Sequence, residues 1–123
     1  ALMQAVMEGV AFSIADCMTA LKGSGTAIKT LLAIGGGSQS RFWVETLATV
    51  LGQPIGLLAG GENGAAMGAA RLAIMATTGA STAEVMHTPE AAETIDPNTE
   101  YSAAYADAHA RYRRLYPALK AAL

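Results

Sequence analysis

Apolar residues recur every three or four positions in the first part of the chain, at 2, 6, 10, 14, 17, 18 and 21. This spacing places them on one face of a helix, because an α-helix turns once in about 3.6 residues. We therefore predict a helix over residues 2–21, ended by the glycine-rich segment 23–25. Cys17 lies on the apolar face, so we expect it to be buried in the core and not to act as a nucleophile.

Two short apolar runs follow, at residues 28–34 and 55–58, and glycine flanks both. They lack strict alternation, which is typical of strands buried on both faces in a parallel sheet. Between them, Ser38 or Ser40 can cap a helix that runs to about residue 51. The buried face of that helix is predicted to carry Trp43, Leu47, Val50 and Leu51.

The second half of the chain is predicted to be mostly helical. A helix rich in small residues begins near Glu62, and a short helix covers residues 82–86. Residues 87–98 are predicted to be a loop, and a last helix spans about 99–119, with Pro117 ending or kinking it. A stripe of tyrosines on this helix should pack on the sheet or on the first helix, or else form a surface exposed by truncation of the domain: Tyr101, Tyr105 and Tyr112.

Helices that alternate with buried strands predict an α/β fold, with helices packed on a short parallel sheet. Two strands are fewer than the roughly four to six of a typical sheet. The chain also opens on Ala1 within a helical pattern, without an initiator methionine. We therefore interpret the sequence as one piece of a larger domain.

The composition and the net charge exclude several classes of protein. Hydrophobic residues make up 52% of the 123 residues and charged residues 15%, against roughly 25% charged in an average domain, which excludes a disordered chain. A net charge of -2 does not favour binding to nucleic acid or to an anionic membrane. We see neither an apolar run of about 20 residues nor a signal peptide. The single cysteine fits a reducing compartment, so we expect a cytoplasmic protein.

The triple glycine Gly35–Gly37, between a predicted strand and a predicted helix, is the sharpest local feature. Such a turn can bring backbone N–H groups against a phosphate or a ribose, or it can simply be a tight turn. A Walker A loop is excluded because no lysine follows the glycines. A dinucleotide-dependent oxidoreductase fits poorly, because Leu58 and Ala59 stand where the ribose-binding carboxylate would be.

The remaining polar candidates are predicted to be structural. Glu8 should make a contact at the domain core, Asp16 should be solvated, and Glu62 should be a helix-start charge. His87 and His109 lack a partner at metal-ligand spacing, so we predict no metal site. A cluster of arginines is expected to lie on the outer face of the last helix: Arg111, Arg113 and Arg114.

The segment 35–43, Gly-Gly-Gly-Ser-Gln-Ser-Arg-Phe-Trp, resembles the adenosine motif of the FGGY carbohydrate kinases. These enzymes belong to the actin-like, ribonuclease-H-like ATPase superfamily. Residues 5–12 are similar to the helix that precedes this motif in the family, and residues 64–70 are similar to its small-residue helix. Residues 111–119 resemble the end of the xylulose kinases.

This resemblance implies ATP-dependent phosphorylation of D-xylulose to xylulose 5-phosphate, with Mg²⁺, in a cleft between two domains. Residues 1–123 would be the C-terminal portion of the C-terminal domain. They would supply the adenosine side of the cleft through Gly36, Gly37 and Ser40, with Gly35 and Gly37 also allowing the turn. The catalytic aspartate, the ketose-binding residues and both phosphate loops of the family are not found here, so we expect the chain alone to be inactive. The alternative is a non-catalytic module that buries its open sheet edge against a second copy.

Overall fold

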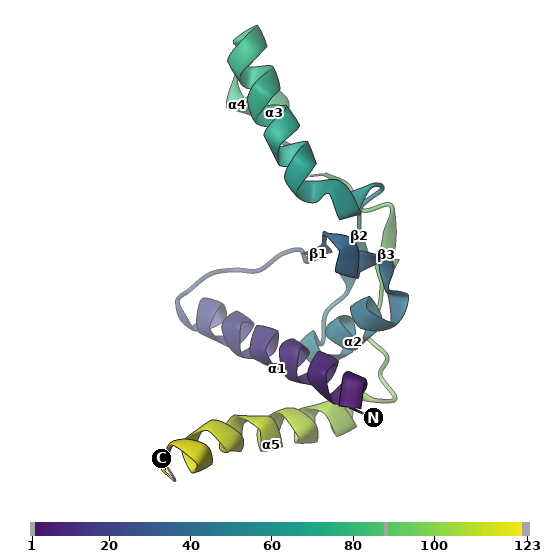
Figure 1. The fold of residues 1–123 in the computed structure, drawn as a ribbon, viewed down its shortest axis with the longest axis vertical. Helices are drawn as coiled ribbons and strands as arrows, with labels where there is room; N and C mark the ends of the chain where they lie inside the picture. Colours follow the sequence, from purple (N-terminus) through teal and green to yellow (C-terminus); the bar gives the residue numbers. More distant parts are fainter. Residues whose placement is uncertain (1, 88, 122–123) are drawn as a thin grey trace.

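The computed structural model describes residues 2–87 and 89–121, and the side chain of Glu62 lies outside the description. Its helices are α1 (Leu2–Gly23), α2 (Arg41–Leu51), α3 (Gly64–Thr78), α4 (Thr82–Val85) and α5 (Ser102–Lys120). Its strands are β1 (Leu32–Ala33), β2 (Ile55–Leu57) and β3 (Glu93–Ile95), and two 3₁₀ turns, η1 (Gly36–Gln39) and η2 (Gly61–Asn63), follow β1 and β2. The sheet occupies the middle of the molecule, with α3 and α4 on one side of it and α1 and α5 on the other (Figure 1).

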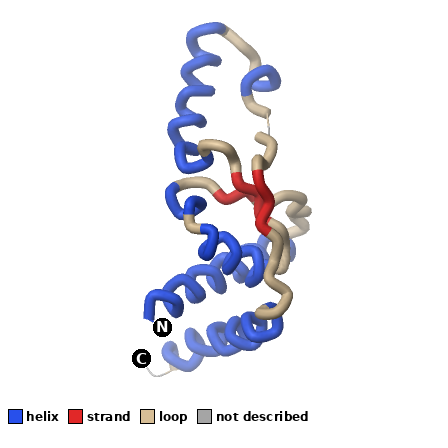
Figure 2. Tube along the Cα trace, turned by 90° about the vertical axis from the view of Figure 1, so that its right-hand side faces the viewer, coloured by secondary structure: helices blue, strands red, loops and turns tan. Residues whose placement is uncertain are grey.

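The strands form one sheet in the order β1-β2-β3, which Figure 2 shows at the centre of the chain. β1 and β2 are parallel, with Leu32 opposite Gly56, as the sequence predicted. β3 pairs antiparallel with β2, with Ile95 opposite Ile55. The prediction of a helix-rich α/β fold is therefore confirmed, whereas the prediction of a purely parallel sheet and of a loop throughout 87–98 was wrong. β3 has one buried residue, Ile95, and is too short to show a period.

The first predicted strand is shorter than its apolar run. Of residues 28–34, only Leu32 and Ala33 are paired as a strand. Continuing the register backward would place Thr30 opposite Pro54, and proline has no N–H to donate to a ladder. The apolar run is therefore longer than the part of it that can pair with β2.

The core lies between α2 and the sheet. Val44 and Ala48 of α2 are buried against Ile55 of β2 and Ile95 of β3. The residues of the predicted α2 face, Trp43, Leu47, Val50 and Leu51, are only half-buried. The predicted helix is therefore confirmed, but the centre of its buried face is rotated by one residue.

α1 packs on α2 and on α5 mainly through residues outside its predicted apolar face, of which only Met18 is buried. Its buried residues are Ala11, Phe12 and Met18. The predicted face is instead exposed at Leu2, Val6, Val10, Ile14 and Leu21. Cys17 is also exposed, so its predicted burial was wrong. Within the described part of the chain, no element covers this row.

Aromatic side chains hold α5 against α1. The ring of Phe12 lies 6.4 Å from that of Tyr105 and 5.6 Å from that of Tyr112, measured between centroids. The predicted packing of these two tyrosines on the first helix is confirmed, whereas Tyr101 is 52% exposed. α5 continues past Pro117 to Lys120, so the proline does not end the helix at its own position.

Candidate functional site

The glycine turn lies where the parallel strands β1 and β2 end. Gly35 has φ 83° and ψ 176°, a conformation that is open almost only to glycine. Its N–H donates a hydrogen bond of 2.9 Å to the carbonyl oxygen of Gly61, at the start of η2. The two glycine-rich turns are therefore held side by side at the carboxyl edge of the parallel pair, where ligands bind in open α/β sheets.

The start of η1 is open to solvent. Gly36 and Gly37 are exposed, and a Cβ added to Gly36 would meet nothing within 4 Å. Amides at the start of a helical turn have no carbonyl within that turn to bind, so the N–H groups of these two glycines suit an external acceptor. The hydroxyl of Ser38 donates to the carbonyl oxygen of Gly35 at 2.7 Å and stabilises the bend.

Trp43 supports the turn from the first part of α2. Two atoms of its indole ring, Cδ1 and Nε1, lie 3.5 Å from the position that a Cβ on Gly37 would take. The ring is half-buried, which agrees with the predicted packing role better than with stacking on a base. Gly37 therefore faces the indole, and Gly36 is the more open of the two candidate contacts.

Ser40 is the residue that caps α2. Its side-chain oxygen accepts a hydrogen bond of 3.3 Å from the N–H of Trp43, which settles the predicted choice between Ser38 and Ser40. Ser40 is exposed, and the capping bond uses a lone pair and not the hydroxyl hydrogen. A contact from Ser40 to a nucleotide stays a prediction.

A cavity of about 420 Å³ adjoins the turn through Gly61. Ile34, Gly64 and Arg71 are among the residues that line it. The guanidinium of Arg71 donates to the carbonyl oxygen of His87 at 3.4 Å. The glycine turn thus has a hollow beside it whose lining includes one positive side chain, Arg71, and one negative side chain, Glu90.

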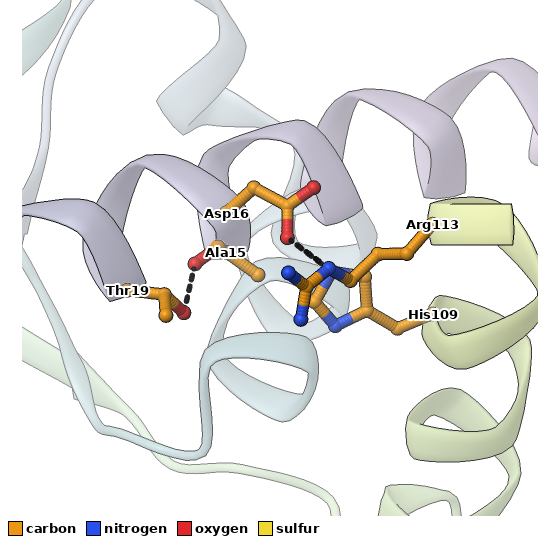
Figure 3. Close-up of polar contacts among 5 residues, drawn as sticks. All are labelled: Ala15, Asp16, Thr19, His109 and Arg113. Atoms are coloured by element: carbon orange, nitrogen blue, oxygen red, sulfur yellow. Dashed lines mark hydrogen bonds and ion pairs between the residues drawn. The ribbon is translucent and has the colours of Figure 1, made fainter. Parts of the chain in front are cut away.

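Asp16 joins α1 to α5 in the contact that Figure 3 shows. Its Oδ1 lies 3.0 Å from Nε2 of His109 and 3.3 Å from Nε of Arg113. The prediction that Asp16 is solvated was therefore wrong, and His109 has a partner that its sequence position hides. Arg113 contacts α1, whereas Arg111 and Arg114 are exposed as expected.

The other polar candidates do not gather at the turn. Glu8 accepts a hydrogen bond of 2.8 Å from Gln4 on the surface of α1, so its predicted place at the core was wrong. The side chain of Glu62, predicted to be a helix-start charge, lies outside the described residues. Among the residues that the structure does describe, no three His, Cys, Asp or Glu side chains are grouped to hold a metal ion.

The position of η2 is the part of the site that sequence reasoning missed. Gly61 is distant from Gly35 along the chain, and only the pairing of β1 with β2 brings the two together. The available signal was that each glycine-rich segment directly follows a predicted strand. Parallel neighbours end at the same edge of a sheet, so such segments meet there.

Together, the sheet and its two turns define an α/β domain with a glycine turn at the carboxyl ends of a parallel strand pair. The C-terminal domain of the FGGY family of carbohydrate kinases matches residues 1–77. Over 119 residues, the chain is 36% identical to the xylulose kinase of Escherichia coli strain K12, which covers 96% of this chain and 25% of that relative.

Solved structures agree. The fold is similar to a "xyloylose kinase" from Brucella ovis, with a TM-score of 0.85 and 49% identity, over 100% of this chain and 26% of that one. A xylulose kinase from Rhodospirillum rubrum has a TM-score of 0.74 and 30% identity, over 97% of this chain and 24% of that one. The fold is thus that of sugar kinases of the actin-like ATPase type, as the resemblance implied.

The chain belongs to the FGGY family of carbohydrate kinases. It spans 25% of the length of the Escherichia coli relative. In the described part of the chain, no helix is long and apolar enough to cross a membrane.

Proposed function

We propose that this chain supplies the adenosine-binding side of the ATP site in a kinase that converts D-xylulose to xylulose 5-phosphate. The observation that carries the proposal is the open start of η1, where Gly36 is exposed and has free space beside it. FGGY kinases are ATP-dependent sugar kinases. In this proposal all of residues 1–123 belong to the C-terminal domain, and the protein acts in the cytoplasm.

Three residues carry the nucleotide contacts in this proposal. The backbone of Gly36 faces the nucleotide, and the N–H groups of Gly36 and Gly37 donate to it. The hydroxyl hydrogen of Ser40 is available to a polar atom near the adenine, because the α2 cap uses only its oxygen. Gly35 holds the backbone in the required bend through its bond to Gly61. These contacts position the nucleotide, and positioning contributes much of the catalysis in phosphoryl transfer.

The chain by itself is proposed to be inactive. Among the described residues, no three His, Cys, Asp or Glu side chains are grouped to hold a metal ion, so we assign no Mg²⁺ ligand to this chain. In our proposal, the residues that hold Mg²⁺, take the sugar proton and bind the ketose lie in family segments that this chain does not cover. One side of a nucleotide site should bind ATP weakly.

Exchange of the corresponding quarter of the Escherichia coli xylulose kinase for this chain tests the proposal. The chimera should phosphorylate D-xylulose with ATP, and Gly36→Ala should raise KM for ATP at least tenfold. The added methyl projects into the open space assigned to the nucleotide, whereas KM for D-xylulose should change less than twofold. Initial rates with each substrate varied in turn measure both constants.

Gly23→Ala is the matched control, because Gly23 is exposed at the end of α1 and a Cβ there also meets nothing within 4 Å. It should leave both KM values unchanged. An unaltered KM for ATP in a folded, active Gly36→Ala chimera contradicts the assigned contact. If the chimera phosphorylates another ketose or polyol faster than D-xylulose, the proposed substrate is wrong. The proposed nucleotide contacts would not be affected.

Self-association is the second candidate function, and the uncovered row on α1 favours it. Val6 is 57% exposed and Val10 is 48% exposed, on a helix whose row of apolar residues faces away from α2. An apolar helix face of this kind is stabilised when a second surface covers it.

A further inference from the structure

A second cavity lies between α1, α2 and the segment that joins β3 to α5. Its volume is about 300 Å³, at the lower end of the range of about 300–1,000 Å³ for small-molecule sites. It is lined by Gln4, Phe42, Glu45, Thr46, Thr49, Asn98, Tyr101 and Tyr105. No residue of the glycine turn is among them, so this cavity is distinct from the proposed nucleotide site.

The charged side chain among the residues that line this cavity is negative. Glu45 carries a carboxylate, and none of the other lining residues is a lysine, an arginine or a histidine. The side-chain amide of Asn98 donates to Oε1 of Glu45 at 3.1 Å, which fixes the carboxylate without neutralising it. The lining therefore presents a negative charge that a cation can balance.

The threonine hydroxyls of the lining have no free hydrogen to donate to a ligand. Thr46 donates its hydroxyl hydrogen to the carbonyl oxygen of Phe42 at 2.8 Å, and Thr49 donates its own to that of Glu45 at 2.7 Å. Each hydroxyl has one hydrogen, so both are already committed. Thr49 also accepts from the N–H of Asn98 at 3.0 Å, and both threonines are buried, so this side offers a ligand no threonine hydroxyl hydrogen, and the carboxylate of Glu45 disfavours anions.

Aromatic side chains supply the rest of the wall. Phe42 is 56% exposed and Tyr101 is 52% exposed, and Tyr105 is half-buried beside them. The faces of aromatic rings attract cations through the negative charge of their π-electrons. Rings together with a carboxylate are the chemistry that recognises alkylammonium groups.

We propose that this cavity binds a small alkylammonium cation, with Glu45 balancing its charge and Phe42 and Tyr101 contacting its alkyl groups. Choline is the probe for residues 1–123, and its uncharged isostere 3,3-dimethyl-1-butanol has the same shape. Choline should bind at least tenfold more tightly than the alcohol and should shift the ring NMR signals of Phe42 and Tyr101. Binding should weaken as salt is raised, because ions screen the charge of Glu45. Equal affinity for the alcohol, or no binding of choline, overturns the proposal.

Two substitutions locate the site. Glu45→Gln keeps an oxygen that accepts from Asn98 but removes the charge, so choline affinity should fall at least tenfold while the fold is kept. Tyr101→Leu removes a ring from an exposed position and should weaken choline binding at least threefold. Glu90→Gln removes the same charge outside the cavity and serves as the control. If Glu90→Gln weakens binding as much as Glu45→Gln, choline responds to net charge and the site assignment is wrong.

Discussion

Neighbouring glycines in the turn after β1 have different physical roles. Gly35 adopts a backbone conformation that strains any other residue, by about 1 to 3 kcal/mol. Gly36 has no left-handed φ and no neighbour within 4 Å of an added Cβ. The first glycine is therefore required by the backbone, and the second is required only if a ligand needs the space.

Substitution of these two residues separates the roles. Gly35→Ala should lower the free energy of unfolding by about 1 to 3 kcal/mol, whereas Gly36→Ala should change it by less than about 0.5 kcal/mol. Urea denaturation followed by circular dichroism measures both values. Equal losses of stability would contradict the distinction, and Gly36→Ala would then no longer serve as a clean probe of nucleotide binding.

At the scale of elements, α4 depends on a capping box. The N–H and the hydroxyl of Ser81 both donate to Oε2 of Glu84, at 2.8 and 2.7 Å. The hydrogen bond from the Ser81 side chain, and next that from its backbone, lowers the pKa of Glu84 below its ordinary value of 4.5. The carboxylate therefore stabilises α4 above pH 4.5, and this contribution is lost as the pH falls through the lowered pKa of the folded protein.

Amide exchange at Ser81 should therefore speed up below pH 4.5, relative to the intrinsic rate at each pH. Glu84→Gln should remove this pH dependence, because its side chain does not titrate. NMR exchange spectra recorded across this range provide the measurement. If the protection of the Ser81 amide is the same above and below the pH at which Glu84 titrates, the capping box does not stabilise α4.

The docking of α5 on α1 combines an aromatic cluster with a partly exposed polar contact. Phe12 is 5% exposed and stacks on the ring of His109, whereas the side chain of Asp16 is 39% exposed. Truncation of a buried phenylalanine costs about 3 to 5 kcal/mol, and an exposed ion pair contributes about 1 kcal/mol or less. Phe12→Ala should therefore release α5 far more than Asp16→Asn.

Hydrogen exchange of the α5 amides measures this release. Phe12→Ala should abolish their protection, and Asp16→Asn should reduce it by less than tenfold. Tyr116→Ala is the control for loss of a ring, because Tyr116 is 71% exposed on α5 and is not among the rings that contact Phe12. A larger effect from Asp16→Asn would mean that the polar contact, and not the aromatic cluster, holds the helix.

At the scale of the whole molecule, apolar surface is distributed unevenly. α1 exposes its predicted core face, and α3 has no buried residue and exposes Met67, Leu72 and Ile74. We expect the isolated chain to self-associate as its concentration rises, because association removes these faces from water.

A double change, Val6→Lys and Val10→Lys, should shift the chain toward monomer, since both positions are exposed and tolerate charge. Light scattering after size exclusion gives the mass. Gln4→Lys with Thr19→Lys adds the same charge on the opposite side of α1, at exposed positions, and should have a smaller effect. A monomeric chain at high concentration would remove self-association as a candidate function.

Local chemistry made some elements predictable. Ser40 caps α2 because capping involves residues three positions apart, and glycine ends the strands and helices around it. β3 was missed because its formation depends on β2, and a three-residue strand leaves no period to detect. The contact from Asp16 to His109 was missed for a related reason, because it joins residues on two separate helices.

The sequence alone determined the helices to within about three residues at each end, the parallel pair and the position of the glycine turn, since each depends on spacing within a short segment. Tertiary structure decided which face of α1 is buried, which glycine faces the indole of Trp43, and how Gly61 meets Gly35. An apolar pattern specifies a face that favours burial, but only the neighbours that fold against it decide whether that face is covered.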